Sequence, residues 1–126
     1  MSKMLPIATY EDYQDGQIIF EEGSHGDWIY IIESGSVEIS RAVEGKRTVI
    51  TVLEAGDVFG EIAFLSRVPR TATARAVGET TVGLLDRTFL DGEYNRLSQH
   101  FQEILKILSM KLKKTTDLVL EKSIQS

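Results

Sequence analysis

The residues best suited to chemistry lie in one stretch, from Phe59 to Thr73. Gly60 has no Cβ atom, so its backbone can approach a ligand closely or adopt a positive φ. Glu61 follows, and an ionised carboxylate only accepts hydrogen bonds, which suits a sugar hydroxyl and repels a phosphate. Arg70 carries a planar guanidinium that can hold a phosphate through two parallel hydrogen bonds. One end of the stretch therefore prefers a sugar and the other prefers a phosphate.

Local sequence signals predict how this stretch folds. The segment Glu61 to Leu65 fits about one turn of helix, and the first amides of such a turn lack internal partners and favour an anion. Pro69 prevents the helix from continuing and favours an extended conformation at Val68. Arg70 then stands at the start of a strand. The predicted turn, short helix and strand bring the carboxylate and the guanidinium into one loop.

This stretch resembles a known family. Residues 59–65 read Phe-Gly-Glu-Ile-Ala-Phe-Leu and residues 69–73 read Pro-Arg-Thr-Ala-Thr. Both runs resemble the phosphate-binding cassette of cyclic nucleotide-binding domains, and the resemblance extends from about Asp15 to the C-terminal helix. It implies that Glu61 binds the ribose 2′-hydroxyl and that Arg70 pairs with the exocyclic phosphate oxygens. The ligand-binding residues that it implies in the cassette are Gly60, Glu61, Ile62, Ala63, Arg70, Thr71 and Ala72, with the amides of Ile62 and Ala63 and the amide or hydroxyl of Thr71 completing the phosphate cradle.

A purely structural role for the charged residues is the alternative. Glu61 and Arg70 would then form a partly buried ion pair that ties the loop to the sheet. Such a pair is costly to desolvate. A captured phosphate gives the arginine a reason to be there, so the binding interpretation is favoured.

The resemblance also implies where the base lies. It places the strand that holds Thr51 and Leu53 beside the purine, although Leu53 fits an ordinary barrel core nearly as well. Thr115 and Thr116 resemble a hydroxyl pair that bacterial cAMP regulators use on the adenine amino group, while Thr71 permits cGMP without requiring it. We therefore expect cAMP or cGMP as the regulatory ligand, with cAMP preferred.

Composition limits the function classes. The chain has 126 residues, a net charge of −5 and no cysteine, so we expect one domain, no disulfide and no zinc–thiolate site. The acidic balance argues against direct nucleic-acid binding. No signal peptide and no apolar run near the ~20 residues of a membrane span is visible, which predicts a cytoplasmic protein with no membrane contact, although a domain cut from a larger membrane protein would look the same.

The fold class follows from short β-rich runs separated by turn signals such as Asp15-Gly16 and Glu44-Gly45-Lys46. This pattern is typical of a mainly β protein. The resemblance implies an eight-stranded double-stranded β-helix, or jelly roll, with flanking helices, covering about residues 15–86. Met1 to Tyr13 shows little periodicity and is expected to be a short helix or arm, and Arg87 to Asn95 includes a turn at Asp91-Gly92. The expected strands are Gln17–Phe20, Trp28–Ile32, Ser36–Ser40, Thr48–Leu53, Thr71–Val77 and Thr80–Asp86.

The apolar period becomes helical from Leu97 onward, which predicts a C-terminal helix within about residues 97–122, starting near an N-cap at Ser98. Its apolar face either packs on the barrel alone or pairs with a partner helix in a homodimer. The resemblance favours the partner helix, with the seam formed by Leu105, Leu108, Leu112, Thr115 and Val119.

Catalytic chemistry is not indicated. A cupin-type metal enzyme needs a cluster of histidines and carboxylates, whereas His25 and His100 are far apart and both fit solvated positions. We expect a regulatory module that is not an enzyme, holds no metal, shifts its C-terminal helix on ligand binding and acts on an effector protein that the sequence does not identify. The alternative is a degenerate domain that keeps the fold and serves only in dimerisation.

Overall fold

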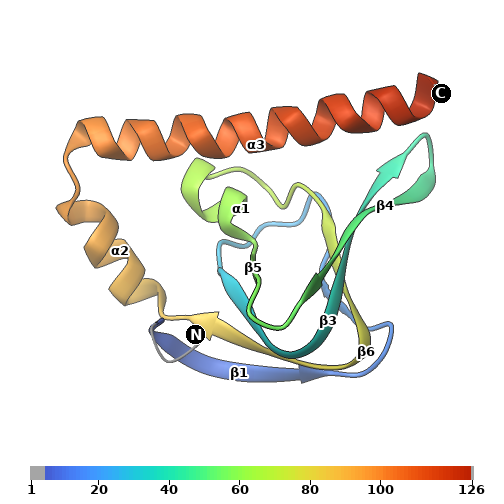
Figure 1. The fold of residues 1–126 in the computed structure, drawn as a ribbon. Helices are drawn as coiled ribbons and strands as arrows, with labels where there is room; N and C mark the ends of the chain where they lie inside the picture. Colours follow the sequence, from blue (N-terminus) through green and yellow to red (C-terminus); the bar gives the residue numbers. More distant parts are fainter. Residues whose placement is uncertain (1–4, 126) are drawn as a thin grey trace.

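The computed structural model describes residues 5–125, except for the side chains of Val119 and of residues 121–125. These residues form a curled antiparallel sheet with a long helix across one side (Figure 1). The elements in chain order are β1 Ile7–Tyr13, β2 Ile18–Phe20, β3 Tyr30–Val43, β4 Lys46–Glu54, β5 Val58–Phe59, α1 Glu61–Ser66, β6 Thr73–Leu85, α2 Arg87–Arg96 and α3 Gln99–Gln125.

The sheet runs in the order β1-β6-β3-β4, with β2 on β6 and β5 on β3. Within β3, Ile31 and Ile32 are both almost fully buried although they point to opposite faces. One face packs into the interior of the roll with Val37, Phe59 and Val82. The other face packs with Phe64 of α1, so the short helix is fastened to the outside of the sheet.

The mainly β fold with C-terminal helices is confirmed. Among the described residues, β3 and β6 each cover two of the expected strands, because the backbone bends without ending the ladder. The register of β3 against β6 shifts twice between Ile32 and Ser36, around Gly35. Divided at these bends, the described strands number eight, although one of them, β1, lies before the roll expected over about residues 15–86.

Two local expectations were wrong. Residues Ile7–Tyr13 form β1, because their hydrogen-bonding partner is β6, far away in the sequence. Asp91-Gly92 lies inside α2 and makes no turn. That helix begins at an N-cap, where Asp86 accepts a hydrogen bond from the Phe89 amide at 3.0 Å. A glycine inside a helix costs only about 1 kcal/mol, which the cap and tertiary packing can offset.

The C-terminal helix begins as predicted, since the Phe101 amide donates to Ser98 Oγ at 3.2 Å. Its large apolar side chains, however, point mostly to solvent. Exposed examples are Phe101, Ile104, Ile107, Leu108, Leu112 and Leu118. Of the expected seam, Leu108, Leu112 and Thr115 are exposed and Leu105 is half-buried, while the side chain of Val119 lies outside the described residues. The structure therefore does not show the alternative in which the apolar face of the C-terminal helix packs only on the barrel.

The bend in β3 generates a prediction about stability. A Cβ atom at Gly35, where φ is 87°, would lie 2.4 Å from Glu79 O and 2.5 Å from Thr80 Oγ1. We expect Gly35→Ala to lower the free energy of unfolding by about 3 kcal/mol, combining positive-φ strain with a clash. Gly78→Ala is the matched control, because Gly78 has φ 71° but open space around it, and it should cost only about 1 kcal/mol. Equal losses in urea unfolding would show that the clash is relieved.

Candidate functional site

The turn that opens the site requires a glycine. Gly60 follows β5 at φ 87° and caps α1, whose first turn no side chain caps. A Cβ atom there would lie 2.8 Å from Arg70 Nη1 and 2.9 Å from Trp28 O. The close approach of these groups thus explains why this position is glycine. The predicted short helix is confirmed and ends at Ser66, with Arg67 as its C-cap, shortly before Pro69.

Arg70 is a buried cation held by main-chain oxygens. Its side chain and backbone together are 4% exposed. Nη1 donates to Gly60 O at 3.1 Å and Nη2 donates to Trp28 O at 2.9 Å. The guanidinium also lies over the Phe20 ring, 4.2 Å from its centroid. Burial lowers the pKa of Arg70 from its usual value, although nearby Tyr30, Asp27 and Glu61 oppose this effect.

No carboxylate among the described residues forms an ion pair with Arg70. The structure therefore does not show the alternative, an ion pair between Glu61 and Arg70 that links the loop to the sheet. Instead, the buried Oε2 atom of Glu61 has no hydrogen-bond partner in the part of the chain that the structure describes. An unsatisfied buried acceptor is costly, and a donor from a ligand would relieve it.

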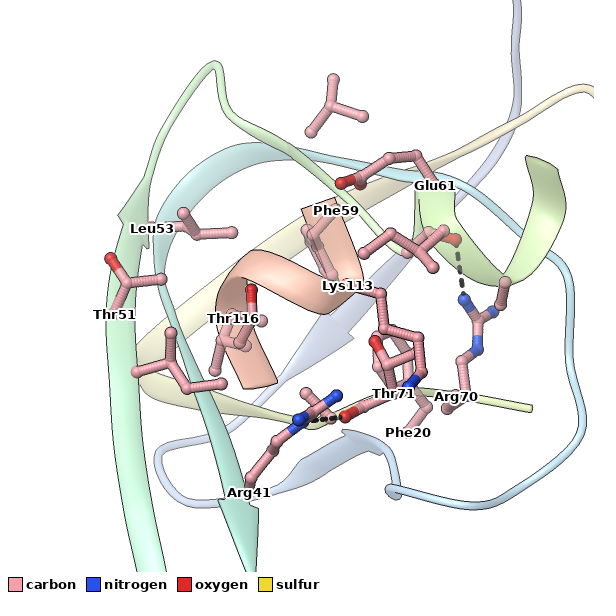
Figure 2. Close-up of a pocket in the computed structure, with 17 residues that line it drawn as sticks. Phe20, Arg41, Thr51, Leu53, Phe59, Glu61, Arg70, Thr71, Lys113 and Thr116 are labelled. Carbon is pink, nitrogen blue, oxygen red and sulfur yellow. Dashed lines mark hydrogen bonds between the residues drawn. The ribbon is translucent and has the colours of Figure 1, made fainter. Parts of the chain in front are cut away.

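A cavity of about 240 Å³ lies between the cassette, β4 and α3 (Figure 2). Its volume is close to the lower end of the roughly 300–1,000 Å³ typical of small-molecule pockets. Ten of the eleven predicted site residues line it: Thr51, Leu53, Gly60, Glu61, Ile62, Ala63, Arg70, Thr71, Ala72 and Thr116. Residues from segments far apart in the sequence thus surround one space.

Comparison with known proteins identifies this arrangement. The family model described as "Cyclic nucleotide-binding domain" matches residues 10–96. The chain belongs to the cyclic nucleotide-binding domain family.

Several relatives have known roles. The domain is 32% identical over 107 residues to a CRP-like cAMP-activated global transcriptional regulator of Mycobacterium tuberculosis, covering 84% of this chain and 48% of the relative. It is 37% identical over 105 residues to the cAMP-dependent protein kinase regulatory subunit of Debaryomyces hansenii, covering 83% of this chain and 22% of the relative. The chain therefore spans about half or less of the length of these relatives.

A solved structure shares the fold. The cAMP-bound form of the EAL enzyme Bd1971 aligns with a TM-score of 0.80 at 26% identity, covering 93% of this chain and 31% of that chain. The same protein has also been solved with cGMP, and that form aligns with a TM-score of 0.77 at 28% identity over 83% of this chain and 28% of that chain. This structural relative is thus known in a cAMP-bound and in a cGMP-bound form.

Thr115 is the predicted site residue that lies outside the cavity of the domain. Its side chain is exposed, whereas that of Thr116 lines the cavity. Successive residues on an α-helix are rotated by about 100°, and at this point of α3 the rotation turns Thr116 toward the cavity and Thr115 away from it. The hydroxyl pair expected from the resemblance is therefore split within this chain.

Sequence reasoning missed two charged residues at the cavity. Arg41 comes from β3 and Lys113 from α3, and both line the space below the cassette (Figure 2). Neither belongs to a local motif, and Lys113 looks like one of several lysines on a solvated helix face. The apolar lining residues Phe20, Ile39, Ile50, Val58 and Phe59 were also missed as site residues. Only the alternation in each strand hinted that these positions face inward.

The described residues contain neither a metal-binding cluster nor a helix that could span a membrane. Among the described residues no group of three or more histidines, cysteines or carboxylates is placed to hold a metal ion, and both histidines are exposed. In the same part of the chain, no helix combines the length and the apolar character needed to cross a bilayer.

The environment of Arg70 generates a prediction. We expect Arg70→Ala and Arg70→Lys to weaken binding of a cyclic nucleotide by at least about a hundredfold, because each charge-assisted hydrogen bond to phosphate contributes roughly 1.5–3 kcal/mol. Lysine keeps the charge but loses the planar fork. Titration calorimetry checks affinity and thermal unfolding checks folding. Near-wild-type affinity in folded Arg70→Ala would exclude Arg70 as the phosphate ligand.

Proposed function

We propose that this domain binds a 3′,5′-cyclic purine mononucleotide, cAMP in preference to cGMP, as a regulatory module. The observation that carries the proposal concerns one cavity. Among the described residues, a buried carboxylate oxygen of Glu61 has no hydrogen-bond partner, and the buried guanidinium of Arg70 forms no ion pair with a carboxylate. A molecule that offers a hydroxyl donor next to an anion satisfies both groups. A ribose fused to a cyclic phosphate has this combination.

The phosphate contacts follow from the hydrogen bonds of Arg70. A guanidinium carries five N–H donors, and the described hydrogen bonds use Nη1 and Nη2 for main-chain oxygens. Donors remain for a phosphate, and the anion supplies the countercharge that the buried site lacks. Amides at the start of α1, at Ile62 and Ala63, would contribute further donors where the helix begins.

The base preference follows from the hydroxyl of Thr116. Its Oγ1 donates to Leu112 O at 3.0 Å within the helix, so its oxygen is left as an acceptor toward the cavity. An adenine amino group donates hydrogen bonds and matches this acceptor, whereas the guanine 6-oxygen does not. Thr51, Leu53 and Ile50 supply the wall against which a purine would bury apolar surface.

The regulatory part of the proposal rests on α3. Residues of this helix close one side of the cavity, so a ligand that contacts them stabilises the conformation in which the helix is docked. The outward apolar residues of α3 suit a second copy of the chain or an effector protein. The proposal assigns no chemical reaction to the chain and places it in the cytoplasm.

The competing proposal is a degenerate domain that binds no nucleotide and serves only in dimerisation. The exposed apolar residues of α3 favour that interaction role, but they do not explain the unsatisfied Glu61 oxygen. Calorimetric titration with cAMP and cGMP, combined with sedimentation at several protein concentrations, separates the two. Dimerisation without binding of either nucleotide would replace our proposal with the degenerate alternative.

Glu61 generates the next prediction. We expect Glu61→Gln to weaken cAMP binding by roughly tenfold, because a hydrogen bond to a charged acceptor is replaced by a neutral one. Binding of 2′-deoxy-cAMP, which lacks the hydroxyl donor, should change much less. Calorimetry of both ligands on both proteins measures the difference. If the wild type binds the two ligands equally, Glu61 does not recognise the 2′-hydroxyl.

The two neighbouring threonines allow a matched test of base recognition. We expect Thr116→Val to reduce cAMP affinity by about three- to tenfold, since one net hydrogen bond is lost, and to leave cGMP affinity nearly unchanged. Thr115→Val is the control, because Thr115 is exposed and lies outside the cavity lining. Competition binding of the two nucleotides measures both effects. Equal losses for cAMP and cGMP in Thr116→Val would exclude the amino-group contact.

A further inference from the structure

Arg41 connects three parts of the molecule. It lies on β3 and lines the cavity. Its Nε donates to the main-chain oxygen of Thr71 at 2.6 Å, and its Nη1 forms an ion pair with Asp117 of α3. The Arg41 side chain is only 13% exposed. A single guanidinium therefore contacts the residue next to Arg70 and the helix that closes the cavity.

Asp117 has a second cationic partner. Lys113 Nζ lies 3.2 Å from Asp117 Oδ2, one helical turn away, and Lys113 also lines the cavity. The hydrogen bond from Arg41 lowers the pKa of Asp117; burial opposes this effect, and the hydrogen bond from Lys113 adds to it. The carboxylate is thus held in its charged form at the edge of the site.

Among the described residues, the other polar contact between α3 and the cassette is a single hydrogen bond. Ser66 of α1 and Ser109 of α3 share a hydrogen bond between their hydroxyl groups. Most large apolar side chains of this part of the helix, such as Leu108 and Leu112, point to solvent, whereas Leu120 is buried. Few large apolar side chains therefore hold the helix over the cavity. The contact between Arg41 and Asp117 consequently contributes a larger share of the free energy that docks α3.

We propose that Arg41 is a positioning residue that couples nucleotide binding at the cassette to docking of α3 through Asp117. The inference rests on the proposed function. Thr71 follows Arg70 directly, so a phosphate bound at Arg70 further restrains the main chain that carries the Thr71 carbonyl. That carbonyl fixes the Arg41 guanidinium in the orientation that receives Asp117. Coupling between two sites is reciprocal, so docking of α3 raises nucleotide affinity by the same factor.

This arrangement differs from an ordinary surface ion pair. Exposed pairs contribute little because both side chains are mobile and solvated. Here the arginine is largely buried and already fixed by a main-chain oxygen, so it loses little freedom when it binds the carboxylate. Lysine at position 41 would keep the charge but could not span both acceptors with a fork.

The test uses four variants: Arg41→Ala, Arg41→Lys, Asp117→Asn and the double variant Arg41→Ala/Asp117→Asn. Arg47→Ala is the control, because Arg47 pairs with Glu38 on the neighbouring strands and does not line the cavity. Amide hydrogen exchange of residues 109–120 without ligand measures helix docking, and calorimetry with cAMP measures affinity. Thermal unfolding verifies that each variant folds, and Asp117→Asn, at the partly exposed edge, keeps the test available if Arg41→Ala does not fold.

We expect each single variant to accelerate exchange in α3 and to weaken cAMP binding by about five- to twentyfold, in the range of typical coupling between sites. The double variant should be no worse than the weaker-binding single variant, because both remove one interaction. Arg47→Ala should match the wild type.

Two results overturn the inference while leaving the proposed function intact. The first is wild-type cAMP affinity in both Arg41→Ala and Asp117→Asn. The second is additive loss of affinity without any change in exchange of α3, which would make the two residues independent ligand contacts. Absence of cyclic nucleotide binding by the wild-type chain is the different result that overturns the proposed function.

Discussion

The structure depends on how a buried guanidinium is accommodated. Arg70 is 4% exposed, and no described carboxylate forms an ion pair with it. Burying a charge without a partner is unfavourable, so the surrounding chain must supply oxygen atoms and an aromatic face. Main-chain oxygens of Gly60 and Trp28 and the ring of Phe20 fill this role. Close packing around the guanidinium in turn excludes a side chain at Gly60, where a Cβ atom would lie 2.8 Å from Arg70 Nη1. The positive charge of the guanidinium still has no described anionic partner, and an anionic ligand can supply one.

The sequence was sufficient where the cause of structure is local. The positive φ at Gly60, the short helix after it and the N-cap at Ser98 are each specified by residues within a few positions, and all three are present. It was insufficient where the cause is a distant partner. Segment Ile7–Tyr13 is a strand only because β6 lies beside it. Arg41 joins the site only because Thr71 and Asp117 reach it from two other elements. No spacing within β3 marks that position.

Helical periodicity shows a similar limit. The pattern after Leu97 correctly predicted a helix with one apolar face, but a period does not say toward which neighbour that face points. In the structure the inward side of α3 is mainly polar or small, with Ser109, Lys113 and Thr116, and most of the large apolar residues face outward, although Leu120 is buried. The same uncertainty affected the threonine pair, since one step along the helix decides which hydroxyl reaches the cavity. Interpretation of a helix next to a site therefore needs the packing angle as well as the sequence.

This orientation of α3 determines how a partner would affect the ligand. The outward residues, such as Leu108 and Leu112, are accessible while the inward residues close the cavity. A protein that binds the outward face can therefore do so with the helix docked, and it does not compete with a nucleotide for Thr116 or Lys113. Because coupling between two binding events is reciprocal, a partner selective for the docked helix would raise nucleotide affinity by the same factor by which the nucleotide raises affinity for the partner. A partner that required the inward face would have to break the contact between Arg41 and Asp117 and open the cavity, and its effect would have the opposite sign. The sign of the coupling thus identifies the face of α3 that a partner uses.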